Sequence, residues 1–253
     1  MRKIIFNEDK ALIDSGTFFG RGVFETILIK NKPHFLKEHI ERLNDGIRKL
    51  SLGETVTLDE ILKKINEYKL YNLALKIVVT EKNIIFSTRE IKYNSESYKN
   101  GFKVKISDNI RNSKSILTYI KSINYLDNLL EYEQANQEGY NEAIFFNENN
   151  RLAEGCTTNI FIVKDNIIYT PSEKCGLLNG IIRRYVIDNF NVYEKEISKE
   201  ELLNADEVFL TNSLVGIIKV SEIEGCKFES KITEGIRKAY EEHIEVREVL
   251  ING

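Results

Sequence analysis

Apolar residues recur along the chain at two spacings, one typical of helices and one typical of strands. Leu36, Ile40, Leu43, Ile47 and Leu50 follow one another at intervals of three and four residues, which places them on one face of an amphipathic helix. Runs of β-branched and aromatic residues between short polar turns predict strands. In the first part of the chain we expect strands at 2–6, 24–30, 73–80 and 84–88, and helices at 36–50 and 57–68.

The second part of the chain continues this mixture. Gly139 ends the helical pattern of residues 125–138, because glycine suits the position just after a helix. Ser198 and Glu201 form a capping box, which predicts a short helix after them. We also expect strands at 142–146, 159–164, 167–170 and 207–211, a strand-like stretch at 115–120, and helices at 180–190 and 232–250.

Strand hairpins mixed with helices in both parts predict an α+β fold of two domains, with a cleft between them. A chain of 253 residues is long enough for two domains that each have a core. Residues 107–115 are polar and show no clear period, which makes them the best interdomain boundary. We therefore expect a smaller N-terminal α+β domain at 1–110 and a larger C-terminal α+β domain at 111–253.

The composition narrows the class of protein. A chain with 42% hydrophobic and 30% charged residues is typical of globular proteins. The net charge of −3 and the lack of a basic run argue against a nucleic-acid partner. No apolar run reaches the roughly 18 residues of a membrane span, and the N-terminus turns acidic by Glu8, too soon for a signal peptide. We therefore expect a soluble protein with no membrane partner.

Cysteine and histidine usage excludes several kinds of site. The three cysteines are odd in number and widely spaced, unlike a disulfide framework, so a reducing cytoplasm is the expected location. Cys156 has no histidine near it in sequence, and we interpret it as a small packed thiol. His34, His39 and His243 lack the spacing of metal ligands, so we expect no metal and interpret each as a surface or packing residue.

Lys121 and Glu154 are the strongest candidates for catalysis. A buried lysine amine can form an imine with an aldehyde, and a carboxylate can keep a pyridine nitrogen protonated, which are the two requirements of a pyridoxal phosphate enzyme. Glu154 stands 33 residues after Lys121 and is followed by small residues that would let a flat ring approach. Taken alone, Lys121 is more simply interpreted as a surface lysine at a helix start, and Glu154 as a hairpin carboxylate in solvent.

Two segments suit the phosphate of such a cofactor. Arg42 carries a fork of donors that fits a phosphate dianion, although an exposed helical arginine is the simpler interpretation. Gly180 begins a predicted helix, where free backbone amides and the positive end of the helix dipole favour an anion. A glycine at a helix start is common, and the segment lacks the ending of a nucleotide P-loop.

Together these segments resemble the class IV aminotransferase family, the fold-type IV pyridoxal phosphate enzymes. The resemblance extends in the family's order from about residue 16 to residue 220. The segments that carry it are GVFET (22–26), EHIERL (38–43), KSINYL (121–126), EGCTTNIF (154–161), GIIR (180–183) and TNS (211–213).

The resemblance implies pyridoxal 5'-phosphate as the cofactor and a role for each matching residue. Lys121 would be the Schiff-base lysine and Glu154 the partner of the pyridine nitrogen, both catalytic. The implied phosphate ligands are Arg42, the amides of Ile181 and Ile182, and Ser213, and the other implied cofactor contacts are Thr157 and Tyr125. The family also implies a D-amino-acid aminotransferase-like fold, with the site in the interdomain cleft and completed by a homodimer partner.

Within the family, two pairs of segments look like the 4-amino-4-deoxychorismate lyases. The first pair is YTP (169–171) and GLLNG (176–180), and the second is ADE (205–207) and TNSL (211–214). This implies conversion of 4-amino-4-deoxychorismate to 4-aminobenzoate and pyruvate, a step of folate biosynthesis. The alternative is an amino-acid aminotransferase of the D-amino acid or branched-chain type. Their respective Arg-x-His and Tyr-x-Arg-Pro motifs do not occur here. One departure from many lyases is the short turn at 81–83, where they carry a loop rich in arginine and glycine.

Overall fold

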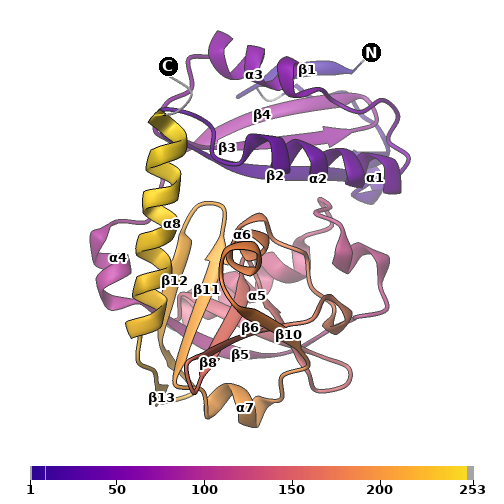
Figure 1. Ribbon diagram of the computed structural model, residues 1–253. Helices are drawn as coiled ribbons and strands as arrows, with labels where there is room; N and C mark the ends of the chain where they lie inside the picture. Colours follow the sequence, from indigo (N-terminus) through magenta and orange to yellow (C-terminus); the bar gives the residue numbers. More distant parts are fainter. Residues whose placement is uncertain (1, 9, 250–253) are drawn as a thin grey trace. The chain divides into compact units, whose positions relative to one another are not determined.

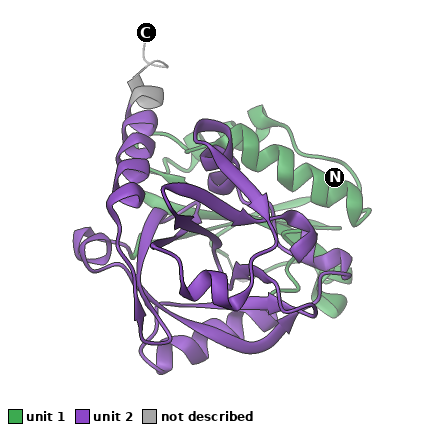
Figure 2. Cartoon of the chain, turned by 60° about the horizontal axis from the view of Figure 1, so that its bottom comes forward, with its two compact units in different colours: residues 1–92, 120–125 green, residues 93–119, 126–253 purple. Residues whose placement is uncertain are grey.

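The computed structural model describes residues 2–8 and 10–249. Its internal contacts divide the chain into two compact units, 1–92 with 120–125 and 93–119 with 126–253 (Figure 2). Lys121 belongs to the first unit, because the short segment around it pairs with residues of that unit. The domain limits expected from the sequence, 1–110 and 111–253, differ from this division and stay a prediction.

The first unit combines one sheet with helices (Figure 1). Within the described residues its sheet has four strands in the order β1-β4-β3-β2, with β1 parallel to β4 and the other neighbours antiparallel. Its elements are β1 (Lys3–Phe6), α1 (Ser15–Phe19), β2 (Gly22–Ile29), α2 (Leu36–Lys49), α3 (Leu58–Glu67), β3 (Leu73–Thr80) and β4 (Asn83–Arg89).

Helix α2 covers one face of this sheet with the apolar stripe that its sequence predicts. Ile40, Leu43 and Ile47 are buried in one core with residues of β2 and β3. The helix approaches β2 closely, because a Cβ at Gly46 would lie 2.7 Å from Cγ1 of Val23. This close approach brings the polar residues of α2 that border the stripe against the strand.

The second unit is built on a larger sheet (Figure 1). In the part of the chain that the structure describes, this sheet has nine strands, eight of them in the order β10-β9-β8-β11-β12-β5-β6-β7, with β13 paired to β12. Helix α8 packs on β12 and β11, and α6 packs on β11.

The elements up to β9 are α4 (Ser95–Asn100), β5 (Phe102–Arg111), the 3-10 helix η1 (Ile116–Tyr119), α5 (Leu126–Gln137), β6 (Glu142–Asn147), β7 (Leu152–Gly155), β8 (Asn159–Lys164) and β9 (Ile167–Pro171). They are followed by η2 (Glu173–Cys175), α6 (Ile181–Asn189), β10 (Val192–Lys195), α7 (Lys199–Leu203), β11 (Glu207–Asn212), β12 (Gly216–Ile223), β13 (Cys226–Lys227) and α8 (Lys231–Val249).

The α+β class is confirmed, and the predicted helices and hairpins occur within a few residues of their expected ends. One local prediction is wrong. Residues 115–120 do not form a strand, because the bond from the Thr118 amide to the Ser115 carbonyl winds them into η1. Strand β5 extends to Arg111, into the polar stretch 107–115 that is predicted as the interdomain boundary. The last residue of the helix expected at 232–250 lies outside the described residues.

Among the described residues, no helix combines the length and the apolar character needed to cross a bilayer.

Candidate active site

Backbone pairing with β2 fixes the position of Lys121. The amide of Phe24 donates to the Lys121 carbonyl at 2.9 Å, and the amide of Ile123 donates to the Gly22 carbonyl at 3.0 Å. Ser122 forms an isolated antiparallel bridge with Val23. The segment that carries Lys121 therefore runs along the edge of β2 as a short additional strand would.

The side chain of Lys121 lies against two aromatic rings. Its Nζ atom is 4.5 Å from the centre of the Phe24 ring and 5.7 Å from the centre of the Tyr125 ring. The two rings meet edge to face, with centroids 5.3 Å apart and an interplanar angle of 84°. The structure thus brings together Lys121 and Tyr125, two of the predicted site residues, and adds Phe24 to them.

Arg42 is held by a carboxylate that is completely buried. Glu25, in β2, accepts bonds from Nε and Nη2 of Arg42, each at 2.7 Å, and lies 2.6 Å from Nδ1 of His39. Glu25 is 0% exposed, and only 14% of the Arg42 side chain is exposed. Arg42 is therefore a largely buried, paired residue rather than an exposed helical arginine, and His39 is a buried member of the same cluster.

Burial and the neighbouring charges together shift the pKa values of Glu25 and His39. Burial raises the pKa of Glu25, but Arg42 and His39 outweigh that effect and hold the pKa at about 2. For His39, burial lowers the pKa more strongly than the Glu25 carboxylate raises it, and Arg42 and Lys121 lower it further. Glu25 is therefore ionised at neutral pH and accepts a hydrogen bond from Nδ1 of His39.

Glu154, in the second unit, is likewise a buried carboxylate beside an arginine. It lies in β7 and is nearly buried, with one carboxylate oxygen 3.5 Å from Nε of Arg111 and the other accepting from the Leu178 amide at 2.9 Å. The guanidinium of Arg111 also stacks over Phe145, 4.1 Å from the ring centre. An arginine beside a carboxylate favours its ionised form, which is the form that can accept a hydrogen bond from a protonated nitrogen.

A second buried carboxylate, Glu142, organises the loop that follows Glu154. It accepts bonds from the amides of Cys156 and Thr157 at 3.1 Å, and from the hydroxyl of Thr157 at 2.7 Å. The hydroxyl of Thr158 donates to it as well. The predicted contact of Thr157 with the cofactor stays a prediction, and in the structure its hydroxyl donates to Glu142. Cys156 is buried, and burial raises the pKa of its thiol, in agreement with a packed residue.

The first turn of α6 has the properties of an anion site. Gly180 is the N-cap and makes no side-chain bond to the amides of Ile181 and Ile182. In any α-helix the first amides lack partners within the helix. A Cβ at Gly180 would collide with Oδ1 of Asn159, so a larger residue would require the helix start or the Asn159 side chain to move.

Polar groups of β8 and β11 lie beside that helix start. Asn159 donates to the Leu178 carbonyl at 2.8 Å and pairs in register with Thr211. The Thr211 hydroxyl is buried and has no hydrogen-bond partner among the described residues. Leu178 therefore connects Glu154 with Asn159, and the helix start follows two residues later. Ser213 lies in the turn after β11, where the Asn212 side chain accepts from the amides of Leu214 and Val215.

The residues present fit pyridoxal phosphate. In the second unit, the loop at Leu178 lies between the Glu154 carboxylate and the start of α6, whose first amides suit an anion. The buried Thr211 hydroxyl nearby has no hydrogen-bond partner among the described residues. In the first unit an amine lies against aromatic rings, and a guanidinium is fixed by Glu25. No group of three or more His, Cys, Asp or Glu among the described residues is arranged to hold a metal ion.

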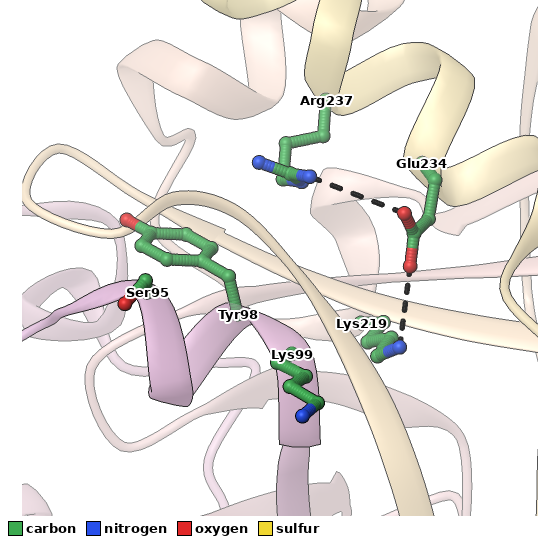
Figure 3. Close-up of a pocket in the computed structure, with 6 residues that line it drawn as sticks. All are labelled: Ser95, Tyr98, Lys99, Lys219, Glu234 and Arg237. Carbon is green, nitrogen blue, oxygen red and sulfur yellow. Dashed lines mark hydrogen bonds and ion pairs between the residues drawn. The ribbon is translucent and has the colours of Figure 1, made fainter.

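The surface pocket in Figure 3 is a different feature. It lies in the second unit between α4, β12 and α8, and none of the predicted site residues lines it. Glu234 is 3.2 Å from Lys219 and 4.0 Å from Arg237, so its carboxylate neutralises these cations. Nothing in this pocket resembles a catalytic arrangement.

Five residues that shape the candidate site were not predicted to belong to it: Glu25, His39, Arg111, Glu142 and Thr211. A signal for two of them was present. Glu25 and Glu142 each stand in a strand that is otherwise almost wholly apolar, and a charged residue in such a strand is rarely buried unless it is paired. For the other three, the roles depend on contacts between residues far apart in the sequence.

Comparison with known proteins shows which family the chain is similar to. The family model of the class IV aminotransferases ("Amino-transferase class IV") matches residues 22–223. The chain is 31% identical to an aminodeoxychorismate lyase of Bacillus subtilis over 245 residues, covering 87% of this chain and 84% of that protein. It is 30% identical to a D-alanine aminotransferase of Bacillus licheniformis over 236 residues, covering 84% and 82%.

A solved structure from Legionella pneumophila, provisionally named a 4-amino-4-deoxychorismate lyase, superposes with a TM-score of 0.84 at 29% identity. The superposition covers 94% of this chain and 98% of that one. The branched-chain amino acid aminotransferase of Escherichia coli shares the fold, with a TM-score of 0.82 at 23% identity and coverage of 92% and 88%. The chain belongs to the class IV aminotransferase family, whose members include both lyases and aminotransferases.

Proposed function

We propose that this protein is a pyridoxal phosphate-dependent lyase that converts 4-amino-4-deoxychorismate to 4-aminobenzoate and pyruvate. The observation that carries the cofactor assignment is the set of groups around Leu178: the Glu154 carboxylate, the open amides of α6 and the buried Thr211 hydroxyl. The likeness to the Bacillus subtilis lyase and the lyase-like segments at 169–180 and 205–214 favour this reaction within the family.

When bound, the cofactor supplies an electron sink for the charge that develops on the substrate carbon. Lys121 would hold the cofactor, and its amine would remove the proton from the carbon that bears the substrate nitrogen. The Phe24 and Tyr125 rings restrict the position of that amine. Glu154 would hold a proton at the pyridine nitrogen, with the positive charge of Arg111 beside the carboxylate.

The phosphate would be bound by Arg42, Ser213 and the amides of Ile181 and Ile182, and Thr157 and Tyr125 would contact the rest of the cofactor. Glu25 fixes the orientation of Arg42 for this purpose. Loss of the enolpyruvyl group as pyruvate leaves an aromatic ring, and the gain of aromaticity drives the elimination.

An amino-acid aminotransferase is the second candidate. It is favoured by the D-alanine aminotransferase of Bacillus licheniformis, which at 30% identity is about as similar to this chain as the lyase. Proton removal by Lys121 is common to both reactions, and they differ in where the proton returns. Turnover that depends on a keto acid would identify the aminotransferase.

We further propose that the protein is a homodimer. In the first unit, Leu12, Ile13, Phe18 and Phe19 are exposed, with Phe18 and Phe19 at 69% and 77%. Exposed apolar residues clustered in this way are typical of a protein interface, and twofold dimers are the commonest closed assembly. Sedimentation should therefore give twice the mass of the 29.3 kDa chain.

The cofactor assignment is tested by reducing the protein with borohydride after loading it with pyridoxal phosphate. Mass spectrometry of the digested protein should find the label on the peptide that contains Lys121, and Lys121→Ala should lose it. Lys63→Ala, an exposed lysine of α3, is the matched control and should keep the label. A label on another lysine, with Lys121 unmodified, would overturn the assignment.

A further inference from the structure

The surface pocket of the second unit is a cavity of about 360 Å³ between α4, β12 and α8 (Figure 3). This volume lies within the range of small-molecule sites, roughly 300–1,000 Å³. The residues that line it are Ser95, Tyr98 and Lys99 of α4, Lys219 of β12, and Glu234 and Arg237 of α8. A ligand that fills this cavity would therefore contact two helices and a strand together.

The charges around the cavity leave one cation over. Lys219 is 3.2 Å from Glu234, and Arg237 donates to Glu241 at 2.7 Å, so two carboxylates offset two cations. The ammonium group of Lys99 has neither an ion pair nor a hydrogen bond among the described residues. A cavity with an uncompensated positive charge favours an anionic ligand.

Other donors of the cavity suit the same kind of ligand. Ser95 contributes a hydroxyl from the helix that carries Lys99. On the opposite side, Nη2 of Arg237 is 4.0 Å from the nearer Glu234 oxygen, which is longer than a hydrogen bond. That edge of the guanidinium can therefore donate to a further acceptor, and guanidinium groups pair well with carboxylates and phosphates.

Tyr98 connects the cavity with the turn that follows β11. It lines the cavity, and its hydroxyl donates to the Val215 carbonyl at 2.9 Å. Helix α8 contacts the same turn, because a Cβ at Gly216 would lie 2.5 Å from Cε1 of Tyr240. Ser213, a predicted phosphate ligand, lies in this turn. Both helices that line the cavity therefore contact the segment that carries Ser213.

We propose that the cavity binds a small molecule with a phosphate or carboxylate group, and that the bound molecule steadies the turn that carries Ser213. Lys99 would recognise the oxyanion, with Ser95 and Arg237 as further donors. A ligand that contacts α4 and α8 together restricts their movement, and with it the movement of the turn between them and β11.

The consequence for the cofactor rests on the proposed function, in which Ser213 binds its phosphate, whereas the binding site itself does not depend on that function. A ligand that stabilises the turn would then strengthen cofactor binding. By linkage, the cofactor would strengthen binding of the ligand by the same factor.

The competing interpretation is that these charges form an ordinary solvated surface that fixes α8 on β12. Phosphate would then act only through the ionic strength, as chloride does. A binding site would instead distinguish phosphate from chloride at the same ionic strength, and its affinity would depend on Lys99.

The first measurement is a calorimetric titration of the cofactor-loaded protein with inorganic phosphate and, separately, with succinate, at an ionic strength held constant with sodium chloride. The bound cofactor already fills its own phosphate site. At least one probe should bind, and the tighter one identifies the ligand group as a phosphate or a carboxylate. Lys99→Gln should raise its dissociation constant about 10-fold, as expected for a hydrogen bond between charged groups. Lys199→Gln, which changes an exposed lysine of α7, should leave it unchanged.

The second measurement is amide hydrogen exchange of residues 212–216 in the same protein. A saturating concentration of the tighter probe should slow this exchange about 5-fold, at the lower end of typical coupling between sites. Tyr98→Phe keeps the ring in the cavity but loses the bond to Val215. This variant should therefore bind the probe without slowing the exchange.

Each result has a distinct meaning. A protein that binds neither probe would overturn the inference, as would equal affinities of the wild-type protein and Lys99→Gln. Exchange that stays unchanged when the probe binds would overturn the coupling to the turn. Neither measurement requires turnover, so a protein that borohydride does not label at Lys121 would refute the proposed function while binding through Lys99 persisted.

Discussion

Glu25 and Arg42 form a two-bond pair in which a wholly buried carboxylate holds one edge of a guanidinium, with both nitrogen–oxygen distances at 2.7 Å. The strand supplies the carboxylate and the helix supplies the guanidinium, so the pair also fixes α2 on β2. Such a pair is costly to break, because removing one partner leaves the other charge buried without compensation. Arg42 is therefore set in one orientation before any ligand arrives.

Glu25→Gln should weaken cofactor binding. A glutamine cannot accept both guanidinium bonds, so Arg42 would lose its fixed orientation. We expect the dissociation constant for pyridoxal phosphate, titrated into the cofactor-free protein, to rise about 10-fold or more, and the free energy of unfolding to fall by roughly 3 kcal/mol.

Asp14→Asn is the matched control, since Asp14 is a buried carboxylate of the same unit that binds Thr80 and backbone amides. It should lower stability without changing the affinity for the cofactor. Unchanged affinity in Glu25→Gln would contradict the role given to this pair.

The same carboxylate should make stability sensitive to acid. The folded state lowers the pKa of Glu25 from 4.5 to about 2, so between these two values the unfolded state binds more protons than the folded state. The stabilisation from Glu25 is complete above the upper value and is lost as the pH falls through this window. Urea unfolding across the window should show a steeper loss for the wild-type protein than for Glu25→Gln. Parallel curves would show that Glu25 is not ionised in the folded state.

Arg111→Met should reduce turnover while the cofactor stays bound. Without the guanidinium, the carboxylate of Glu154 loses the charge that favours its ionised form, and its hold on the pyridine proton weakens. We expect the turnover number to fall about 10-fold, a modest share of the electrostatic contributions measured in enzymes.

Arg151→Met is the control for Arg111, because Arg151 pairs at 3.1 Å with an exposed glutamate of the same unit. It should leave turnover unchanged, since exposed ion pairs contribute little. Equal losses of turnover in Arg111→Met and Arg151→Met would contradict the role proposed for Arg111.

Gly180→Ala should reduce the affinity for pyridoxal phosphate through the start of α6. The added methyl group collides with Asn159, so the helix start or the Asn159 side chain must move. Gly235→Ala in α8 adds the same group where nothing lies within 4 Å, and it should leave the affinity unchanged. Fluorescence titration of both variants with the cofactor measures this difference, and similar affinities in the two would argue against an anion site at α6.

Much of the fold could be predicted from local sequence signals. The apolar repeat from Leu36 predicts α2, and the capping boxes at Thr57 and Ser198 occur in the structure with their expected bonds. These signals succeed because periodicity and capping depend on neighbours within a few residues. The strand expected at 115–120 was wrong. Turn hydrogen bonds accepted by the carbonyls of Asn112 and Ser115 outweigh the strand preference of the apolar run.

The arrangement of the candidate site could be predicted less well from the sequence. Lys121 and Glu154 stand out in the sequence as a motif, but the pairing of Lys121 with β2 joins segments far apart in the chain. The functional roles of all the predicted site residues stay predictions that cofactor titrations of single variants can examine. They are Arg42, Lys121, Tyr125, Glu154, Thr157, Ile181, Ile182 and Ser213.

The most direct test of the proposed reaction is a product assay with the purified, cofactor-loaded protein and 4-amino-4-deoxychorismate. The account predicts that 4-aminobenzoate and pyruvate form in equal amounts without any added keto acid, and that Lys121→Ala forms neither. Turnover of an amino acid that requires a keto acid, with no 4-aminobenzoate formed, would contradict the lyase and identify an aminotransferase.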